Sequence, residues 1–537
     1  MKSVSNCFLL ASLLMLGTCE AQGPSPAPTP SACEGLSAFT LRDITITSAR
    51  LVGPGEFVPP AGPGGGSRGP GGGRSGRPGA PPDAPGATVK ALPAFCRVTG
   101  VGSPHINFEV WLPAPTGPGA WNGKFNGVGN GGLAGFIAYP AMMQALARGY
   151  ATASTDTGHT NRPEDQDWPM RDPALITDFA SRGIHVTAVA AKRLVETYYG
   201  RPPARSYFTG CSGGGGQALS EAQRHPADYD GIVAGAPANY PTQMWPGEMY
   251  SAYVTHRTPA HLLPREKLPI ITSAALAACD AKDGVKDGVL DDPRQCHFNP
   301  AVLACKGADA PDCLTAAQVD SVKKIYEGLK DPSSGARFWP GFEISSELGW
   351  PGHILDAGGP PLSYFKYMVL RDPRWDWKTF DFGDPKSFAV LVDASRRLGP
   401  VLDSIDPDLT PFKQRGGKLI AYHGWLDQNI SPRNTIAYYE RVKERMGGER
   451  DTQSFFRLFM VPGMGHCGGG PGTSTFDALA ALEQWVEQGT APNCIAASRV
   501  ADGKVDRTRP LCVYPMVAVY RRSGSTDEAA NFECRVP

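Results

Sequence analysis

The chain has 537 residues, of which 41% are hydrophobic and 19% charged, and its 52 Lys and Arg balance its 52 Asp and Glu. Such a length is ample for a deep core, and the balanced charge gives no electrostatic reason to expect nucleic acid or an anionic membrane as a partner. The 64 glycines and 51 prolines are concentrated near the N-terminus, so a wholly disordered or fibrous protein is excluded.

Residues 1–21 are predicted to be a signal peptide. An apolar run over 8–16 is about half as long as a bilayer span requires, and cleavage after Ala21 would follow the small-residue rule. A lipoprotein anchor at Cys19 is the alternative. No later apolar run reaches about 20 residues, so no membrane span is expected. Because 13 cysteines also indicate an oxidising compartment, we expect a secreted or periplasmic protein.

The segment 22–94 combines one predicted strand with a predicted disordered loop. Alternating residues over 39–52 favour a strand. The stretch 53–86 holds 22 Gly or Pro in 34 residues, too few apolar groups to offset the entropy of ordering. Further strands are expected at 95–98 and 106–112, and a Cys33–Cys96 disulfide could join the two ends of this β structure.

From about Trp121 predicted strands alternate with predicted helices, which is typical of a parallel sheet with crossover helices. The rhythm stops after about Tyr240 for roughly 160 residues and then resumes at Lys418. We therefore expect one α/β catalytic core, 95–240 with 401–537, interrupted by an insertion over 241–400. The main strands are expected at 125–128, 151–155, 207–209, 231–236, 418–422 and 455–461, and the main helices at 184–199, 217–224 and 435–443.

A G-x-S-x-G motif spans 210–214, between a predicted strand and a predicted helix. In that position the turn presents Ser212 as a nucleophile at a helix N-terminus, whose N–H groups favour an oxyanion. The N–H of Gly213 is one expected oxyanion donor, and Gly132 in the Gly-rich loop 127–132 is the other. The alternative is a purely structural glycine turn.

A base and an acid follow Ser212 in the order expected of an α/β-hydrolase. Asp427 and His466 each end a loop that follows a predicted strand, where open α/β sheets place their sites. His466 would accept the Ser212 proton and return it to the leaving alcohol, while Asp427 would fix the tautomer and stabilise the imidazolium.

Three other polar residues compete for these roles. Asp156 and His159 also follow a predicted strand, but they precede the serine, so they are interpreted as structural or as lining the site. His423 begins the loop of the acid and is interpreted as a packed or hydrogen-bonded side chain.

Two cysteines flank the proposed nucleophile and base. Cys211 precedes Ser212 and Cys467 follows His466, so a geometry that joins the serine to the histidine brings the two sulfurs near disulfide range. Two buried free thiols are the alternative.

Closely spaced aspartates in the insertion suggest a calcium site. Carboxylates and carbonyls at such spacing are the hard oxygen ligands that Ca²⁺ takes, although Asp-Gly pairs alone commonly mark turns. The loop lacks the twelfth-position Glu of an EF-hand. The expected ligands are the side chains of Asp280, Asp283 and Asp287 and the carbonyls of Val285 and Val289.

Four segments together resemble the tannase and feruloyl esterase family, which also includes bacterial mono(2-hydroxyethyl) terephthalate hydrolase: 210–214, 229–237, 422–427 and 461–467. The resemblance runs from about Cys33 to the C-terminus. It implies an α/β-hydrolase core with a large inserted lid domain, a structural Ca²⁺ in the lid, and hydrolysis of aromatic carboxylic esters. It also implies the disulfides Cys211–Cys467, Cys279–Cys296, Cys305–Cys313 and Cys512–Cys534, which leave Cys494 over.

The chain departs from the family pattern beside the serine. Gly213 and Gly216 stand where the family commonly has Thr or Glu and then Arg. Since the residue after the nucleophile borders the acyl pocket, this departure leaves gallate, hydroxycinnamate and terephthalate esters as alternative substrates. Aromatic residues of the insertion either stack on a planar acyl group or form the lid core: Trp350, Phe365, Tyr367, Trp375 and Trp377.

The expected function is that of a secreted serine carboxylic ester hydrolase, which acts on a small aromatic ester through an acyl-enzyme. Mono(2-hydroxyethyl) terephthalate hydrolysis and peptidase activity are rival reactions. A non-catalytic phenolic-binding protein is the alternative from another class.

Overall fold

The computed structural model describes residues 30–60, 88–355 and 357–537, and it has the predicted α/β class. The predicted signal peptide, the alternative anchor at Cys19 and most of the Gly/Pro-rich stretch lie outside these ranges. In the described part of the chain, no helix is both long and apolar enough to cross a bilayer.

A ten-stranded sheet forms the centre of the molecule, in the order β1-β2-β3-β4-β6-β5-β7-β8-β11-β12. Strands β1 to β4 are antiparallel, and the strands from β6 to β12 in this order are parallel. Its strands are β1 (Thr40–Leu41), β2 (Ile44–Val52), β3 (Phe95–Gly102), β4 (Ile106–Pro113), β5 (Lys124–Val128), β6 (Ala151–Thr155), β7 (Arg205–Cys211), β8 (Gly231–Gly235), β11 (Lys418–Gly424) and β12 (Phe456–Val461).

The register brings the carboxyl ends of four parallel strands to one edge. Cys211 pairs with Gly235 across β7 and β8, Gly235 pairs with Tyr422 across β8 and β11, and Gly424 pairs with Val461 across β11 and β12. The loops that follow β7, β11 and β12 therefore leave the sheet side by side, at the edge where open α/β sheets bind ligands.

Helices cover both faces of the parallel strands because neighbouring strand residues point to opposite sides. Phe208 and Leu419 pack in the hydrophobic core that includes residues of α5, α6 and α14. Tyr207 and Ile420 pack in the core that includes residues of α2 and α16. The covering helices are α2 (Tyr139–Ala147), α5 (Gly183–Tyr199), α6 (Gly213–Arg224), α14 (Pro432–Arg445) and α16 (Ala478–Gln488).

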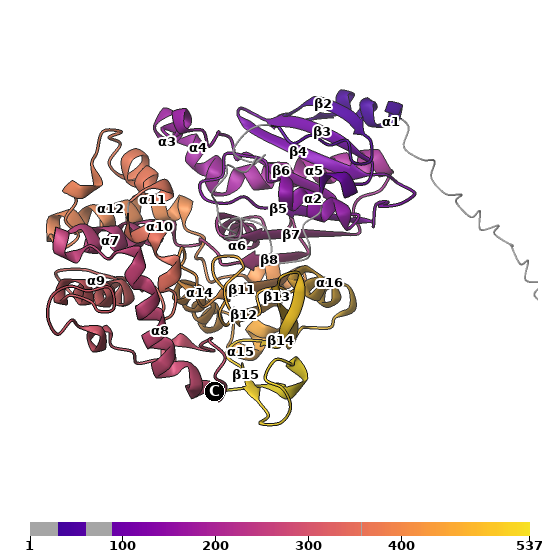
Figure 1. Ribbon diagram of the computed structural model, residues 1–537. Coiled ribbons are helices and arrows are strands. Elements are labelled where there is room, and N and C mark those ends of the chain that lie inside the picture. The colour runs from indigo at the N-terminus through magenta and orange to yellow at the C-terminus, as the bar shows by residue number, and fades with distance from the viewer. Residues whose placement is uncertain (1–29, 61–87, 356) are drawn as a thin grey trace, which may run out of the picture.

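A mostly helical insertion separates β8 from β11. Figure 1 shows α7 to α12 grouped beside the sheet, and their buried residues, such as Trp339 and Tyr364, form a third hydrophobic core. The boundaries between catalytic core and lid remain predictions. The elements of this part are α7 (Pro241–His256), α8 (Leu268–Cys279), α9 (Ala316–Glu327), β9 (Leu329–Lys330), β10 (Arg337–Trp339), α10 (Pro351–Ile354), α11 (Gly359–Ser363), α12 (Pro385–Leu402) and α13 (Thr410–Gln414).

Several smaller elements differ from the sequence prediction or complete it. The single strand expected over 39–52 is two strands, because the chain turns at Asp43, whose φ is 61°. The C-terminal hairpins were not predicted; they pair β13 with β14 and β15 with β16. The remaining elements are α1 (Pro30–Glu34), α3 (Trp168–Arg171), α4 (Ala174–Thr177), α15 (Glu449–Gln453), β13 (Cys494–Ala501), β14 (Lys504–Cys512), β15 (Val517–Tyr520) and β16 (Phe532–Arg535).

Five disulfides tie these elements together, and they coincide with the predicted pairs: Cys33–Cys96, Cys211–Cys467, Cys279–Cys296, Cys305–Cys313 and Cys512–Cys534. Cys494 is an exposed free thiol, as its place outside the predicted pairs required.

Candidate active site

Ser212 lies at the sharp turn between β7 and α6. Its φ of 64° and ψ of −123° lie in a region that non-glycine residues rarely adopt. Neighbouring backbone holds this conformation: the Ser212 N–H donates to the Gly235 carbonyl at 3.0 Å, and the Ser212 carbonyl accepts from the N–H groups of Gly216 and Ala238 at 3.0 and 2.9 Å. The side chain is therefore presented beyond the end of the sheet.

Helix α6 begins at Gly213, four residues before the predicted helix, because its first turn packs against backbone. A Cβ at Gly215 would stand 2.2 Å from the Gly235 carbonyl oxygen, and one at Gly216 would stand 2.6 Å from that of Ala238. Only glycine fits these positions. This close approach explains why a run of helix-weakening glycines forms a helix here.

Asp427 and His466 come from the loops after β11 and β12. The His466 Nδ1 lies 2.8 Å from the Asp427 Oδ2, and both side chains are buried. The N–H groups of Asn429 and Ile430 donate to the Asp427 Oδ1 at 2.8 and 2.9 Å. Since the carboxylate accepts a hydrogen bond from Nδ1, the Nε2 of His466 is left with the lone pair and can accept a proton.

His423 supports the carboxylate from the other side. Its Nε2 donates to the Asp427 Oδ2 at 3.1 Å, and its Nδ1 accepts from the Thr435 hydroxyl at 2.7 Å. Burial alone would raise the pKa of Asp427, but the charge of His466 and the hydrogen bonds from His423 and His466 outweigh it and lower that pKa. Asp427 is thus held as an anion, and His423 has the hydrogen-bonded role that the sequence favoured.

Ser212, Gly213, Gly132 and His466 line one cavity of about 860 Å³. Within the described residues, neither the Gly132 N–H nor the Gly213 N–H donates a hydrogen bond, so both remain available to an oxyanion. The Cys211–Cys467 disulfide, with its Cα atoms 6.0 Å apart, links the strand end before the serine to the loop of the histidine.

Asp156 and His159 do not line this cavity. Asp156 accepts hydrogen bonds from the backbone N–H groups of Asn107 and Gly158. His159 donates from Nε2 to the Leu133 carbonyl at 2.8 Å and stacks on Trp168, and its burial lowers its pKa to about 4. Of the two roles considered from the sequence, Asp156 and His159 therefore have the structural one.

The insertion supplies cavity residues that the sequence pattern did not reveal. Glu248, His353 and Trp245 line the cavity. Of the five aromatic residues of the insertion that the sequence suggested for stacking on the acyl group, only Tyr367 lines it. Helical periodicity shows that a face is apolar, but it does not show whether a protein core or a cavity faces it.

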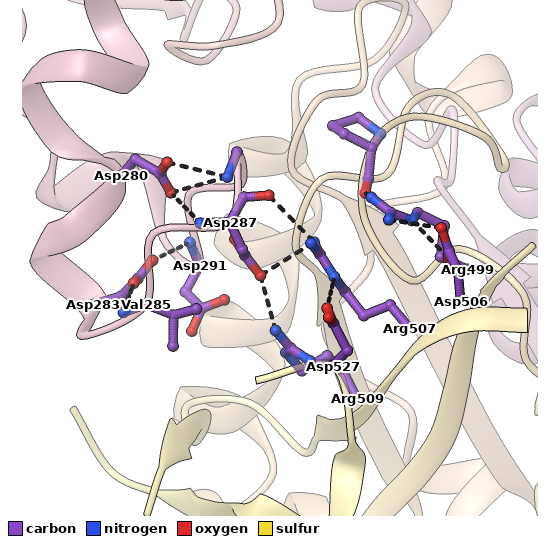
Figure 2. A network of polar contacts seen from close by, with 12 residues as sticks. Asp280, Asp283, Val285, Asp287, Asp291, Arg499, Asp506, Arg507, Arg509 and Asp527 are labelled. Carbon is purple, nitrogen blue, oxygen red and sulfur yellow. Dashed lines mark hydrogen bonds and ion pairs between the residues drawn. The ribbon is translucent and has the colours of Figure 1, made fainter. Parts of the chain in front are cut away.

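The aspartates of the predicted calcium loop gather beside β14, the strand that carries Arg507 and Arg509 (Figure 2). Asp280 accepts from the N–H groups of Asp287 and Gly288, and Asp283 accepts from those of Val285 and Asp291. In the loop, burial first and then neighbouring carboxylates raise the pKa of Asp283 to about 6 and that of Asp291 to about 8.

Two arginines of β14 also reach this loop. Arg509 and Arg507 lie 2.8 and 3.1 Å from the Asp287 Oδ2 (Figure 2). Asp291, which the sequence pattern did not single out, accepts no hydrogen bond with its carboxylate within the described residues. Four carboxyl groups and two guanidinium groups therefore lie close together around this loop.

A strained serine, a histidine and a buried carboxylate at one edge of an α/β sheet define a protein of the hydrolase class. The family model described as tannase and feruloyl esterase matches residues 89–535, so the chain belongs to that family and is a carboxylic ester hydrolase.

Comparison with individual proteins agrees with this family. The chain is 38% identical to an uncharacterized esterase of Xanthomonas campestris, over 95% of this chain and 92% of the relative. It is 36% identical to a probable feruloyl esterase of Arthroderma benhamiae, over 79% and 82% of the two chains. The crystal structure of feruloyl esterase B from Aspergillus oryzae matches 94% of this chain and 100% of its own, with a TM-score of 0.80 and 27% identity.

Proposed function

We propose that the protein is a serine esterase for aromatic carboxylic esters, with Ser212, His466 and Asp427 as its catalytic triad. The observation that carries the proposal is that Ser212 and His466 line one cavity while Asp427 holds the imidazole from behind. The membership in a family of ester hydrolases supports it.

The geometry supports a reaction through an acyl-enzyme. The Ser212 Oγ attacks the ester carbonyl carbon while His466 Nε2 takes the hydroxyl proton, and the N–H groups of Gly213 and Gly132 stabilise the oxyanion. His466 then gives the proton to the leaving alcohol. Water enters, loses a proton to His466 and releases the acid, while Asp427 stabilises the imidazolium in both halves.

The size and lining of the cavity support an aromatic acyl group. Its volume of about 860 Å³ lies in the range of small-molecule sites, and Trp245, Tyr367 and Phe136 offer aromatic surface to a planar ring. Residues of the insertion form one wall, so the insertion acts as the lid of an α/β-hydrolase. Two of the relatives compared above, those of Arthroderma benhamiae and Aspergillus oryzae, are described as feruloyl esterases.

Calcium in the lid is part of the proposal. The donor set consists of hard oxygens, namely the carboxylates of Asp280, Asp283 and Asp287 with the carbonyls of Val285 and Val289. The raised pKa values of Asp283 and Asp291 support the fit, because they report buried, mutually repelling carboxylates whose negative charge a bound cation would neutralise. The ion would stabilise the folded loop and takes no part in the chemistry.

Secretion or export to the periplasm completes the proposal. Five disulfides require an oxidising compartment. The N-terminal apolar run supplies the export signal, with lipid attachment at Cys19 as the alternative form of the mature protein.

The Ser212→Ala variant tests the triad. Removal of the nucleophile oxygen should lower turnover of methyl ferulate by roughly 10⁴ or more while the unfolding midpoint stays near that of the wild type. His466→Ala should be comparably severe. Methyl gallate and mono(2-hydroxyethyl) terephthalate, assayed beside methyl ferulate, identify the preferred acyl group. Activity of Ser212→Ala within tenfold of the wild type would contradict the assignment.

A further inference from the structure

Helix α7 turns one mixed face toward the cavity. Met244, Trp245 and Glu248 all line it, and their spacing of three and four residues places them on one side of the helix. Two of the three are apolar and the third is an acid. A carboxyl group on such a wall is exceptional, because acidic side chains are rarely buried without a partner.

Glu248 lacks such a partner. Its relative exposure is 8%, and within the described residues its carboxyl group makes no hydrogen bond. The nearest basic atom is the Nδ1 of His353, which lies 3.9 Å from the Glu248 Oε2 and thus beyond hydrogen-bond distance. The Glu248 carboxyl group instead faces the cavity, where it is available to a bound hydroxyl.

His353 faces this carboxyl group with an acceptor. Its Nε2 donates to the Asn429 Oδ1 at 2.8 Å, so the proton is on Nε2 and the lone pair is on Nδ1. An oxygen about 2.8 Å from both the Glu248 Oε2 and the His353 Nδ1 fits across the gap. A hydroxyl there donates to His353 and accepts from a protonated Glu248.

Both groups have the protonation state that this requires. Burial first, and then the charge of Asp427, raises the pKa of Glu248 well above its usual range. Burial also lowers the pKa of His353, so its ring is neutral. The pKa values of these two carboxyl groups are thus shifted in opposite directions, which favours the anionic form of Asp427 and the protonated, donating form of Glu248.

We propose that Glu248 and His353 form a hydroxyl-binding subsite that selects acyl groups with a phenolic hydroxyl on the ring. The inference rests on the proposed esterase function and names its substrate class more closely. Trp245 lies one turn from Glu248 on the same face of α7, so a ring packed on the indole would bring its hydroxyl toward the carboxyl group.

Paired methyl esters test the subsite, because methanol leaves no hydroxyl on the alcohol side. The assay compares kcat/KM for methyl cinnamate and methyl benzoate with that for their ring-hydroxylated counterparts, for the wild type, Glu248→Gln and Glu248→Leu. We expect the wild type to prefer the hydroxylated esters by tenfold or more, Glu248→Leu to reduce that ratio at least tenfold, and Glu248→Gln to keep most of it. Glu327→Leu, an exposed acid at the end of α9, is the matched control and should leave the ratio unchanged.

A ratio near one in the wild type, or an equal loss on both esters in Glu248→Leu, would overturn the proposal. A preference that follows hydroxyls of the alcohol would overturn the assignment to the acyl ring. Binding separates this failure from failure of the esterase function: Ser212→Ala protein should bind 4-hydroxycinnamate at least tenfold more tightly than cinnamate by calorimetry. In the double variant Ser212→Ala with Glu248→Leu, the two acids should bind with equal affinity. If the Ser212→Ala protein itself binds both acids equally, the subsite is refuted, whether or not the wild type hydrolyses any ester.

Discussion

Ser212 and Gly213 together show how tightly the turn at the proposed nucleophile is built. Ser212 takes a positive φ because backbone hydrogen bonds from both sides hold it there. Gly213 is the first residue of α6 and does not have a positive φ, but a Cβ there would stand 2.8 Å from the Gly132 carbonyl oxygen. The larger residue that the family commonly carries at this position does not fit beside the Gly132 loop as it stands here.

The Gly213→Ala variant should therefore lose activity through displacement of the oxyanion loop. Loss of one oxyanion donor costs on the order of 10² to 10³ in kcat, and a shifted Gly132 should cost a part of that, with little change in KM. The measurement is kcat and KM on methyl ferulate. Gly352→Ala is the control, because a Cβ at Gly352 meets open space. A wild-type kcat in Gly213→Ala would show that the Gly132 loop accommodates the added methyl group without loss of activity.

At the scale of elements, the proposed calcium loop, residues 280–291, joins the insertion to β14 through Asp287. Chelation with EGTA should lower the free energy of unfolding by about 2 to 3 kcal/mol when free calcium had stood at about 100 times its Kd. The reason is that the proposed ion would be held only by the folded loop. Urea unfolding with and without EGTA measures this change, while kcat at a temperature well below unfolding should change little.

Asp283→Asn should abolish the response of stability to EGTA. Asp312→Asn, an exposed acid of the same insertion outside the loop, should keep the response in full. If elemental analysis of protein purified without chelator finds no calcium, the loop is a set of turns and the ion is absent from the protein.

The Cys211–Cys467 disulfide should matter for catalysis as well as for stability. It closes 256 residues, worth on the order of 5 kcal/mol in the chain-entropy model, and it joins the elements that carry Ser212 and His466. Misplacement of a reacting group by about 1 Å can cost on the order of a hundredfold. The double variant Cys211→Ala with Cys467→Ala should thus lower kcat at temperatures where the protein stays folded.

The matched control removes the Cys305–Cys313 bridge, which closes only 8 residues and does not line the cavity. That double variant should lower stability by about half as much in the same model and leave kcat near the wild-type value. Equal effects of the two double variants on kcat would refute a special role for the Cys211 bridge.

The sequence predicted those elements whose signal is local. Strand ends followed by polar loops located Ser212, Asp427 and His466, because parallel strands bring their carboxyl ends to one edge. The first turn of α6 escaped prediction, since its glycines are explained only by carbonyls from β8 and the loop after it. Glu248 and Asp291 escaped for the same reason: their lack of a partner is a property of the packed molecule and not of the sequence around them.

At the scale of the whole molecule, buried ionisable groups make stability depend on pH. His159 is 6% exposed and stacks on Trp168, and burial lowers its pKa to about 4. In the unfolded chain a histidine takes up a proton below about pH 6.5. Between these values the unfolded state binds more protons, so stability is present above about pH 6.5 and is lost as the pH falls toward 4.

The His159→Gln variant should flatten this part of the pH profile. Glutamine keeps a donor for the Leu133 carbonyl but has no proton to gain, so the loss of stability between pH 6.5 and 4 should shrink by about 3 kcal/mol at most. Asp156 acts with the opposite sign, because burial raises its pKa to about 6, and both variant and wild type retain that effect.

Urea unfolding at a series of pH values measures the difference in pH dependence between the wild type and His159→Gln. His105→Gln, an exposed histidine, is the control and should follow the wild type; parallel profiles for His159→Gln and the wild type would show that His159 titrates alike in the folded and unfolded chain.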